Sequence, residues 1–423
     1  MGKIEKKLEG MISELPRRLV RKKLKKKLRA EGVTDKNAIE AFVEHVMGDN
    51  DGSFVWDDGE EGPPRQINIS FTEEDQNEIL EALERFNEEL PDVVDTALQE
   101  TAKTVAKRLK EDWKWLKIDY KHEQAHFKDR LDQRWKKGLD PLRMMLVAAR
   151  DLGQDYADRL GRSKAKKGIE TRMAISALHI RACQTTLEIL TLIENGLPDG
   201  AYARWRTLYE LNVVAYFIHQ AGDDAASRYF AHDVVSMRTN LTNEFRFYGE
   251  TFDRDKLDEE GRELEDEYNA LIAKFGKPFA SPYGWAADYL GLKKPTFQDL
   301  EKAVDWGALP PEYKMSSFKV HAGVAGTFRT LSTVGGPGHM IAGASNYGMD
   351  TPAILTAQSL LQITVLVFKT PLDIELAAQM QSLALLRDRV AKNCNRIADE
   401  IETEELGKFE EPEGKYGPGE SGR

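Results

Sequence analysis

Residues 178–232 constrain the fold of this chain most strongly, because they read as two apolar helices joined by one short loop. The first helix ends at Asn195-Gly196, where glycine can adopt the left-handed conformation that terminates a helix. Pro198 and Asp199 then open the second helix, with proline where a backbone donor would be unused and an acid at the positive helix end. A loop this short predicts that the two helices are antiparallel neighbours.

Charged side chains interrupt these apolar helices, and they are the candidate functional residues of the stretch. They are Arg181, Glu188, Arg204, Arg206, Glu210, Arg228 and His232. Arg206 and Glu210 lie four residues apart and so share a helix face, whereas Arg181 and Glu188 lie two turns apart. On an antiparallel hairpin the two pairs would approach each other and form a polar seam within the bundle. The simpler alternative is a set of surface ion pairs, each worth about 0.3–0.5 kcal/mol.

The N-terminal segment is strongly basic. Residues 1–30 contain twelve Lys and Arg against three Glu, a local balance of +9 in a chain whose net charge is -11. The apolar positions of the expected helix fall on one stripe, formed by Leu19, Val20, Leu24 and Leu28. This helix is expected either to pack on a more acidic part of the chain or to contact nucleic acid, an acidic membrane surface or a partner. Thr34 is expected to cap a second helix over residues 36–47.

Helix signals continue after a turn-rich acidic stretch. The segment INISF at 67–71 alternates like a strand but stands alone, so it is either an edge hairpin or an extended linker. Thr72 together with Asp75 is expected to open a helix. Pro91 is expected to end that helix, and the Asp-Pro pair at 140–141 is expected to restart the chain as another helix.

One stretch matches a zinc-protease pattern. His122-Glu123-Gln124-Ala125-His126 fits H-E-x-x-H, in which two histidines bind zinc and the glutamate acts as a base. Charged residues surround the motif and no third ligand follows in an obvious context, so a charged surface helix is the expected structure. A di-iron bundle would need two Glu-x-x-His motifs, and only one is present. The sequence therefore predicts neither a metal nor another cofactor.

A second polar stripe is expected on a helix over residues 310–331. Its members Tyr313, Ser317 and His321 repeat every four residues and would share one helix face. The Gly-rich segment at 335–352 follows. It lacks the spacing of a phosphate-binding loop, so we expect it to cap one end of the bundle near the polar seam.

Composition indicates a soluble, reduced protein. The best candidate for a membrane span, AILTAQSLLQITVLVF at 353–368, is shorter than the roughly 20 residues needed and is broken by Gln358, Ser359 and Gln362. The N-terminus lacks the apolar core of a signal peptide. Cys183 and Cys394 both stand in apolar helical surroundings. A cytoplasmic protein without a transmembrane segment is therefore expected.

These patterns predict an all-α protein, a multi-helix bundle with a small basic N-terminal helical module. Oligomeric state cannot be read from the sequence, and a homo-oligomer stays open. The expected segments are a basic module at 1–47, an acidic linker at 48–71, a helical arm at 72–163, a core helical bundle at 164–404 and a disordered tail at 405–423.

Four short runs carry a resemblance to a known family. They are GAYARWRTLYEL at 200–211, RYFAH at 228–232, PYGWA at 282–286 and YKMSSFKVHA at 313–322. They resemble a bacterial family catalogued as domain of unknown function 5677, over roughly residues 125–390. The helical bundle of that family is similar to the HEPN superfamily, whose members include metal-independent ribonucleases of toxin and phage-defence systems. The superfamily carries an Arg and a His on one helix, and the nearest match, Arg228-Tyr-Phe-Ala-His232, is shorter than the usual spacing.

The resemblance implies a metal-independent endoribonuclease acting in phage defence or stress response. Such an enzyme needs a base for the 2′-OH, an acid for the leaving oxygen and cations for the developing charge. The candidate catalytic residues are His321, His232, Arg206, Arg228 and Glu210. The expected partner is then RNA.

The alternative is a non-enzymatic sensor or interaction protein that binds a small anionic or nucleotide ligand at the Arg-rich seam. The candidate ligand-binding residues are Arg204, Arg181, Glu188, Tyr313 and Ser317. In a third hypothesis the seam is purely structural and fixes the register of the helices.

Overall fold

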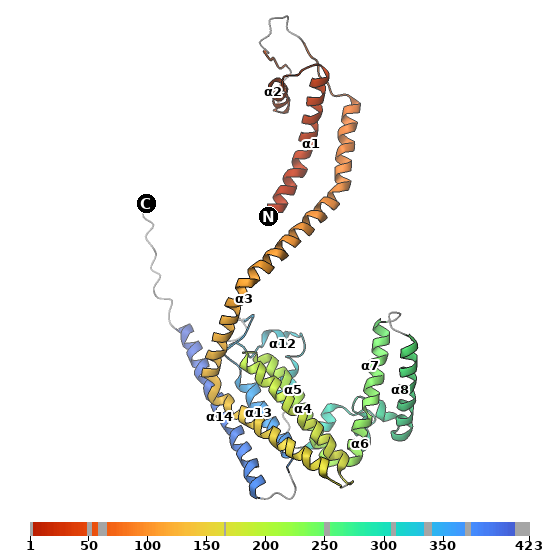
Figure 1. The fold of residues 1–423 in the computed structure, drawn as a ribbon, viewed down its shortest axis with the longest axis vertical. Helices are drawn as coiled ribbons and strands as arrows, with labels where there is room; N and C mark the ends of the chain where they lie inside the picture. Colours follow the sequence, from red (N-terminus) through yellow and green to blue (C-terminus); the bar gives the residue numbers. More distant parts are fainter. Residues whose placement is uncertain are drawn as a thin grey trace. The chain divides into compact units, whose positions relative to one another are not determined.

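The computed structural model describes residues 3–48, 53–57, 66–164, 166–248, 254–305, 310–333, 341–368 and 374–410. Within these ranges the regular elements are helices and none is a strand, so the predicted all-α class is confirmed. The elements are α1 (Lys3–Ala30), α2 (Lys36–Met47), α3 (Glu73–Arg162), α4 (Ile169–Glu194), α5 (Pro198–Ala221), α6 (Asp223–Ala231), α7 (Asp233–Tyr248), α8 (Arg254–Phe275), η2 (Lys277–Ala280), η3 (Gly284–Ala286), α9 (Ala287–Leu290), α10 (Phe297–Val304), α11 (Pro310–Ser317), α12 (Val324–Phe328), α13 (Asp350–Val365) and α14 (Ile374–Glu410) (Figure 1).

The chain forms two compact units, Met1–Tyr120 and Lys121–Arg423. The expected acidic linker at 48–71, the Gly-rich loop at 335–352 and the tail at 405–423 each lie partly outside the described residues. The last helix continues to Glu410, beyond the start of the expected tail.

The first unit has its own small core. Leu24 and Leu28 of α1 pack against Ile39 and Val43 of α2, and all four are buried. The INISF segment is extended and not a strand, and its alternation places two side chains against this core. The cap of α2 is Asp35 and not Thr34, because the Asp35 carboxylate accepts a hydrogen bond from the Asn37 amide at 2.9 Å.

The α3 helix is one continuous element, which corrects two expected breaks. It begins at the predicted capping box, where the Thr72 amide donates to Asp75 at 2.9 Å and the Asp75 amide donates to the Thr72 hydroxyl at 3.3 Å. It then runs through both Pro91 and Pro141 to Arg162. Proline removes one backbone hydrogen bond, a cost of about 3 kcal/mol in a helix interior, but helical neighbours on both sides can still hold the turn. At Pro141 the nearby residues Leu139 and Leu142, one on either side, are buried in the core of the second unit. Their packing helps to keep this turn helical.

The α4–α5 hairpin is the centre of the second unit, as the sequence predicted. The Gly196 amide donates to the Ile193 carbonyl and the Leu197 amide donates to the Leu192 carbonyl, both at 2.9 Å. This pair of bonds is a Schellman motif, and it requires the left-handed φ of 72° at Gly196. Helix α13 packs on both helices of the hairpin, and α14 packs on α13.

Buried tryptophans connect the hairpin and α3 to later parts of the chain. The Trp205 indole donates to the Ser359 hydroxyl at 3.0 Å, and the Asn212 amide donates to the Ser359 carbonyl at 2.9 Å. The Trp135 indole donates to the Asn346 carbonyl at 3.0 Å. A buried indole N–H left without an acceptor would cost roughly 1–3 kcal/mol. These bonds therefore favour the observed packing over arrangements in which either indole lacks an acceptor.

Two further sequence expectations concern the cysteines and the membrane. Cys183 and Cys394 are both free and buried. Burial raises the pKa of the Cys183 thiol to about 11 and that of the Cys394 thiol to about 12. None of the described helices is both long enough and apolar enough to span a bilayer.

His179 is a buried histidine that the sequence analysis did not select. It is 2% exposed, and its Nε2 lies 3.3 Å from the Thr364 hydroxyl, which itself donates to the Leu360 carbonyl. The neighbouring residue on α3 is Gly153, where a Cβ atom would lie 2.7 Å from the His179 ring. Burial lowers the pKa of His179 from 6.5 to about 4. The imidazole is therefore neutral at pH 7.

This burial predicts an acid-dependent loss of stability. Between about pH 6.5 and about pH 4 the unfolded chain binds a proton that folded His179 does not, so the stability is present above this window and falls as the pH drops through it. The loss is at most roughly 3 kcal/mol. Urea unfolding at about pH 7 and about pH 5 should show a weaker pH dependence for His179→Gln than for wild type. The exposed His122→Gln is the control and should keep the wild-type dependence; equal dependence in all three proteins would contradict the assignment.

Candidate functional site

The predicted polar seam forms two groups instead of one. Arg204 of α5 is two residues from Arg206, a rotation of about 200° around the helix, so the two guanidinium groups face different sides. The first group lies on the exposed side of the α4–α5 hairpin and contains Arg181, Glu188 and Arg204. The second contains Arg206 and Glu210. The prediction of a single seam inside the bundle was therefore wrong.

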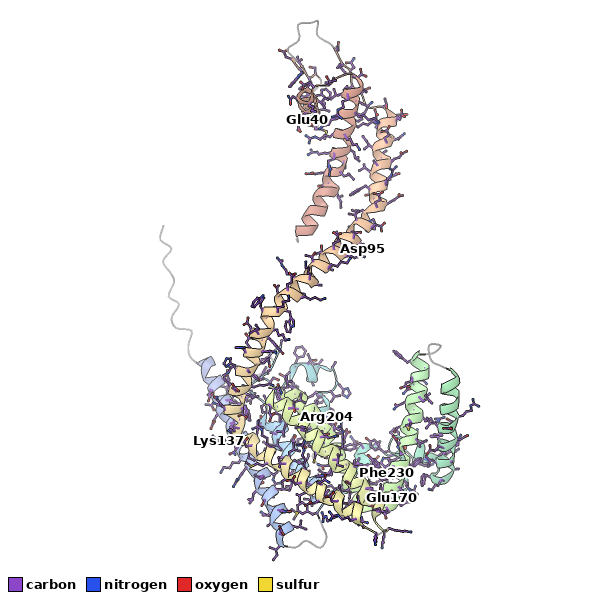
Figure 2. All side chains as sticks on the ribbon, viewed as in Figure 1. Glu40, Asp95, Lys137, Glu170, Arg204 and Phe230 are labelled. Carbon is purple, nitrogen blue, oxygen red and sulfur yellow. The ribbon has the colours of Figure 1, made fainter. Side chains whose placement is uncertain are left out.

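In the first group two arginines share one carboxylate. Glu188 of α4 accepts a bond from Arg204 of α5 and lies 3.5 Å from Arg181. The Arg204 side chain is 27% exposed, that of Glu188 42% and that of Arg181 46%. Figure 2 labels Arg204 on α5. This group, the Arg181–Glu188–Arg204 cluster, is open to solvent and keeps one more positive than negative charge.

In the second group a tyrosine completes an ion pair. Arg206 Nε donates to Glu210 Oε1 at 3.0 Å, and Arg206 Nη2 donates to the Tyr313 hydroxyl at 2.9 Å. The Tyr313 hydroxyl in turn donates to the same Glu210 oxygen at 2.6 Å. The Arg206 guanidinium also lies over the Tyr313 ring, 4.7 Å from its centroid. Burial and the Glu210 hydrogen bond raise the pKa of Tyr313, so its hydroxyl stays protonated and bridges α5 to α11.

Arg228 and His232 are both engaged in packing α6 against the segment that follows α8. Arg228 donates to Asp224 at 2.7 Å and to Asp288 at 3.0 Å. His232 Nε2 lies 2.9 Å from the Ser281 carbonyl, and its ring packs edge-on against Phe279. Burial lowers the pKa of His232 below its usual value.

His321 does not share a helix face with Tyr313, which corrects the second polar stripe. Helix α11 ends at Ser317, and the chain turns back so tightly that a Cβ on Gly326 would lie 2.0 Å from the Phe318 carbonyl oxygen. The Ser317 hydroxyl only donates back to the Tyr313 carbonyl, at 3.4 Å. His321 lies exposed in the bend. The glycines at 323 and 326 were the sequence signal for this helix end.

The segment around His321 is nevertheless anchored to the hairpin. Lys319 is nearly buried, at 5% exposure, and its Nζ lies 2.8 Å from Asp199 Oδ1 at the start of α5. Asp199 also accepts from the Leu331 amide at 3.0 Å and from the Ser332 hydroxyl at 2.7 Å. One carboxylate at the positive end of α5 thus holds both sides of the turn.

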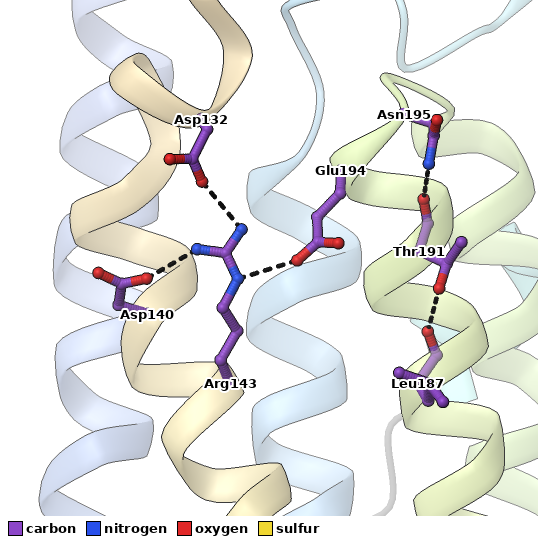
Figure 3. A network of polar contacts seen from close by, with 7 residues as sticks. All are labelled: Asp132, Asp140, Arg143, Leu187, Thr191, Glu194 and Asn195. Carbon is purple, nitrogen blue, oxygen red and sulfur yellow. Dashed lines mark hydrogen bonds and ion pairs between the residues drawn. The ribbon is translucent and has the colours of Figure 1, made fainter. Parts of the chain in front are cut away.

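Arg143 of α3 forms a further arginine cluster, which was not among the residues predicted from the sequence. Its Nη1 donates to Asp140 at 2.7 Å, its Nε to Glu194 at 2.9 Å and its Nη2 to Asp132 at 3.0 Å (Figure 3). Three acids surround one guanidinium, and Glu194 comes from the last turn of α4. The Asp140–Arg143 spacing of three was readable on a helix, but the partner from α4 was not, because it depends on tertiary packing.

The H-E-x-x-H motif lies exposed on α3, where Glu123, His126 and Phe127 contribute to a shallow depression. No group of three His, Cys, Asp or Glu side chains suited to a metal ion occurs in the described part of the chain.

One known family matches the part of the chain that contains most of these clusters. Residues 172–337 match the model of DUF5677, a family of unknown function. The match is narrower than the resemblance at 125–390 and begins within α4. It includes the Arg181–Glu188–Arg204 cluster, the Arg206–Glu210–Tyr313 group and the segment of His321. The DUF5677 description names no activity. No curated protein and no solved structure matches the chain.

The bridging role of Tyr313 predicts a stability effect. Tyr313→Phe removes the hydroxyl that joins Arg206 to Glu210 and should lower the free energy of unfolding by about 1 kcal/mol, the usual net value of such a hydrogen bond. Chemical denaturation followed by circular dichroism measures this change. Tyr289→Phe is the matched control, because Tyr289 is 57% exposed. A Tyr313→Phe protein as stable as the control would show that the bridge contributes nothing measurable.

Proposed function

We propose that the chain is a non-enzymatic binding protein that holds a phosphate-bearing small ligand at the Arg181–Glu188–Arg204 cluster. Guanidinium groups suit this chemistry, because their planar N–H donors fit phosphate oxygens in a bidentate manner. The two arginines come from helices that pack antiparallel, so both donors are held by a rigid element.

The observation that carries the proposal is a comparison of charge among four arginine clusters of the second unit. Arg143 faces three carboxylates and Arg228 faces two. Arg206 faces one, so its pair is neutral. In the cluster of Arg181 and Arg204, two guanidinium groups share a single carboxylate. Of these four clusters, this one alone has cationic charge left over for a ligand.

Glu188 has a defined part in the proposal. Its carboxylate accepts from Arg204 and lies beside Arg181, so it occupies the position that an anionic ligand group would take. A ligand must therefore displace Glu188 or share the donors with it. Exposed ion pairs are worth only about 0–1 kcal/mol, so displacement is inexpensive for a ligand with several charges.

This competition gives two opposite expectations for binding. Arg204→Gln should weaken binding of inorganic pyrophosphate, measured by isothermal titration calorimetry, by roughly tenfold or more, because about 1.4 kcal/mol corresponds to tenfold. Glu188→Gln should strengthen it, because the competing carboxylate is gone.

Arg206→Gln is the matched control, since it removes the same charge from the same helix at a cluster that is already neutral. It should bind like wild type. Wild-type affinity in Arg204→Gln, or weaker binding in Glu188→Gln, would contradict the proposal.

The second candidate is the metal-independent ribonuclease that the resemblance implied, acting in phage defence or stress response. Its support is His321, an exposed imidazole on a segment anchored by the Lys319–Asp199 ion pair. His232 is less suited to proton transfer, because burial lowers its pKa and its Nε2 is occupied by the Ser281 carbonyl.

RNA profiling in a bacterial host separates this candidate from the first. Expression of wild type, with and without phage, should cleave cellular RNA if the chain is a ribonuclease, and folded His321→Ala should leave that RNA intact. His219→Ala is the control, because His219 is also exposed and stands on α5. Intact RNA with every protein, or cleavage retained by His321→Ala, would exclude a catalytic His321.

A further inference from the structure

The cations of α1 fall into two sets, those that form ion pairs within the first unit and those that do not. Those beside the core pair with acids of the same unit: Arg21 with Glu44, Lys25 with Glu40, Lys23 with Asp75 and Glu78, and Lys27 with Asp75. The Lys27 bond, followed by a backbone bond from Thr72, holds the pKa of Asp75 well below its usual range. These pairs explain about half of the basic run as internal structure.

Four of the remaining cations form one stripe on the outer face of α1, whereas Arg17 is exposed but falls outside that stripe. Arg18, Lys22, Lys26 and Arg29 are all exposed. At about 100° per residue they fall within an arc of roughly 80°, opposite the buried Leu24 and Leu28, and they extend over about 16 Å. Within the described ranges none of the four makes a direct ion pair or a hydrogen bond, and the nearest acids, Glu78 for Lys26 and Glu40 for Arg29, bond directly to Lys23 and Lys25 instead. We call these four residues the α1 basic stripe.

We propose that the α1 basic stripe binds the phosphodiester backbone of a nucleic acid. A row of cations about 6 Å apart, one per helical turn, complements a linear polyanion. Duplex DNA carries one charge per roughly 1.7 Å of axis, so the length of the stripe faces more phosphates than it has cations. All four side chains would contact phosphates, which predicts binding without sequence preference.

The same geometry disfavours a membrane surface as the partner. A helix that lies in a membrane interface needs an exposed apolar face beside its cations. The apolar face of α1 is already used, because Leu24 and Leu28 are buried against α2. No large apolar side chain between Arg18 and Arg29 is exposed. The inference concerns residues of the first unit and is independent of the proposed anion site on the α4–α5 hairpin.

Salt dependence measures the number of phosphate contacts directly. Binding of the full-length protein to a fluorescent duplex of random sequence should weaken with salt, with a slope of about -0.9 in log affinity against log salt for each contact. Lys22→Gln combined with Lys26→Gln should reduce the magnitude of that slope by roughly 1.8. Duplex RNA and a single-stranded probe, run in parallel, tell which nucleic acid is bound best.

The matched control changes the same charge elsewhere in the same unit. Lys103→Gln combined with Lys110→Gln alters two exposed lysines of α3 and should leave the slope unchanged. Circular dichroism checks that both double variants are folded. An equal slope change in both, no change in either, or no binding to any of the three nucleic acids would overturn the proposal. Binding to vesicles containing phosphatidylserine, lost only in the stripe variant and without duplex binding, would assign the stripe to an acidic membrane instead.

Discussion

The left-handed junction at Gly196 is the constraint on which the second unit depends. Its backbone closes α4 and starts α5, and the Gly196 carbonyl also accepts the Ser345 amide at 2.9 Å. A Cβ atom at this position would lie 2.6 Å from the Phe127 ring and 2.7 Å from the Ser345 carbonyl oxygen. One residue without a side chain therefore allows α3, the hairpin and the loop before α13 to meet. The antiparallel pairing that follows puts Arg204 beside Glu188 and points Arg206 to the other side.

Local signals predicted the parts of the fold that local chemistry decides. Gly196 and the Thr72–Asp75 box were read correctly, because a cap depends on residues within one turn of the helix end. The expected breaks at Pro91 and Pro141 were wrong, since the helical residues on both sides of a proline can hold the turn through one missing donor. Buried neighbours add to this at Pro141 but not at the exposed Pro91. The end of α11 was missed for the opposite reason. The four-residue repeat of Tyr313 and His321 suggested a continuing helix, and the close approach of Gly326 to Phe318 is a contact that periodicity does not describe.

The candidate residues were identified better than their partners. Arg206 and Glu210 pair as their spacing predicted, but Tyr313 joins them only because α11 packs on α5. Arg143 has the largest number of acids among the clusters compared above, and one of its three partners lies on another helix. Spacing within a helix finds i,i+3 and i,i+4 pairs, whereas contacts between helices need the register of the packed bundle. The charge balance of a cluster, which decides whether it can take an anion, therefore could not be read from the sequence.

A chain with a net charge of -11 would repel a polyanion at long range, yet the α1 basic stripe can still bind one on contact. At physiological salt the Debye length is about 8 Å, so a charge on a partner responds mainly to the residues it approaches closely. Along about 16 Å of helix those residues are four cations without a paired acid in the described structure. The excess acids of the chain then affect the association rate with a nucleic acid more than the strength of the contact at the stripe, because electrostatic steering acts at longer range. Binding of this kind should be slow to form, local and strongly weakened by salt.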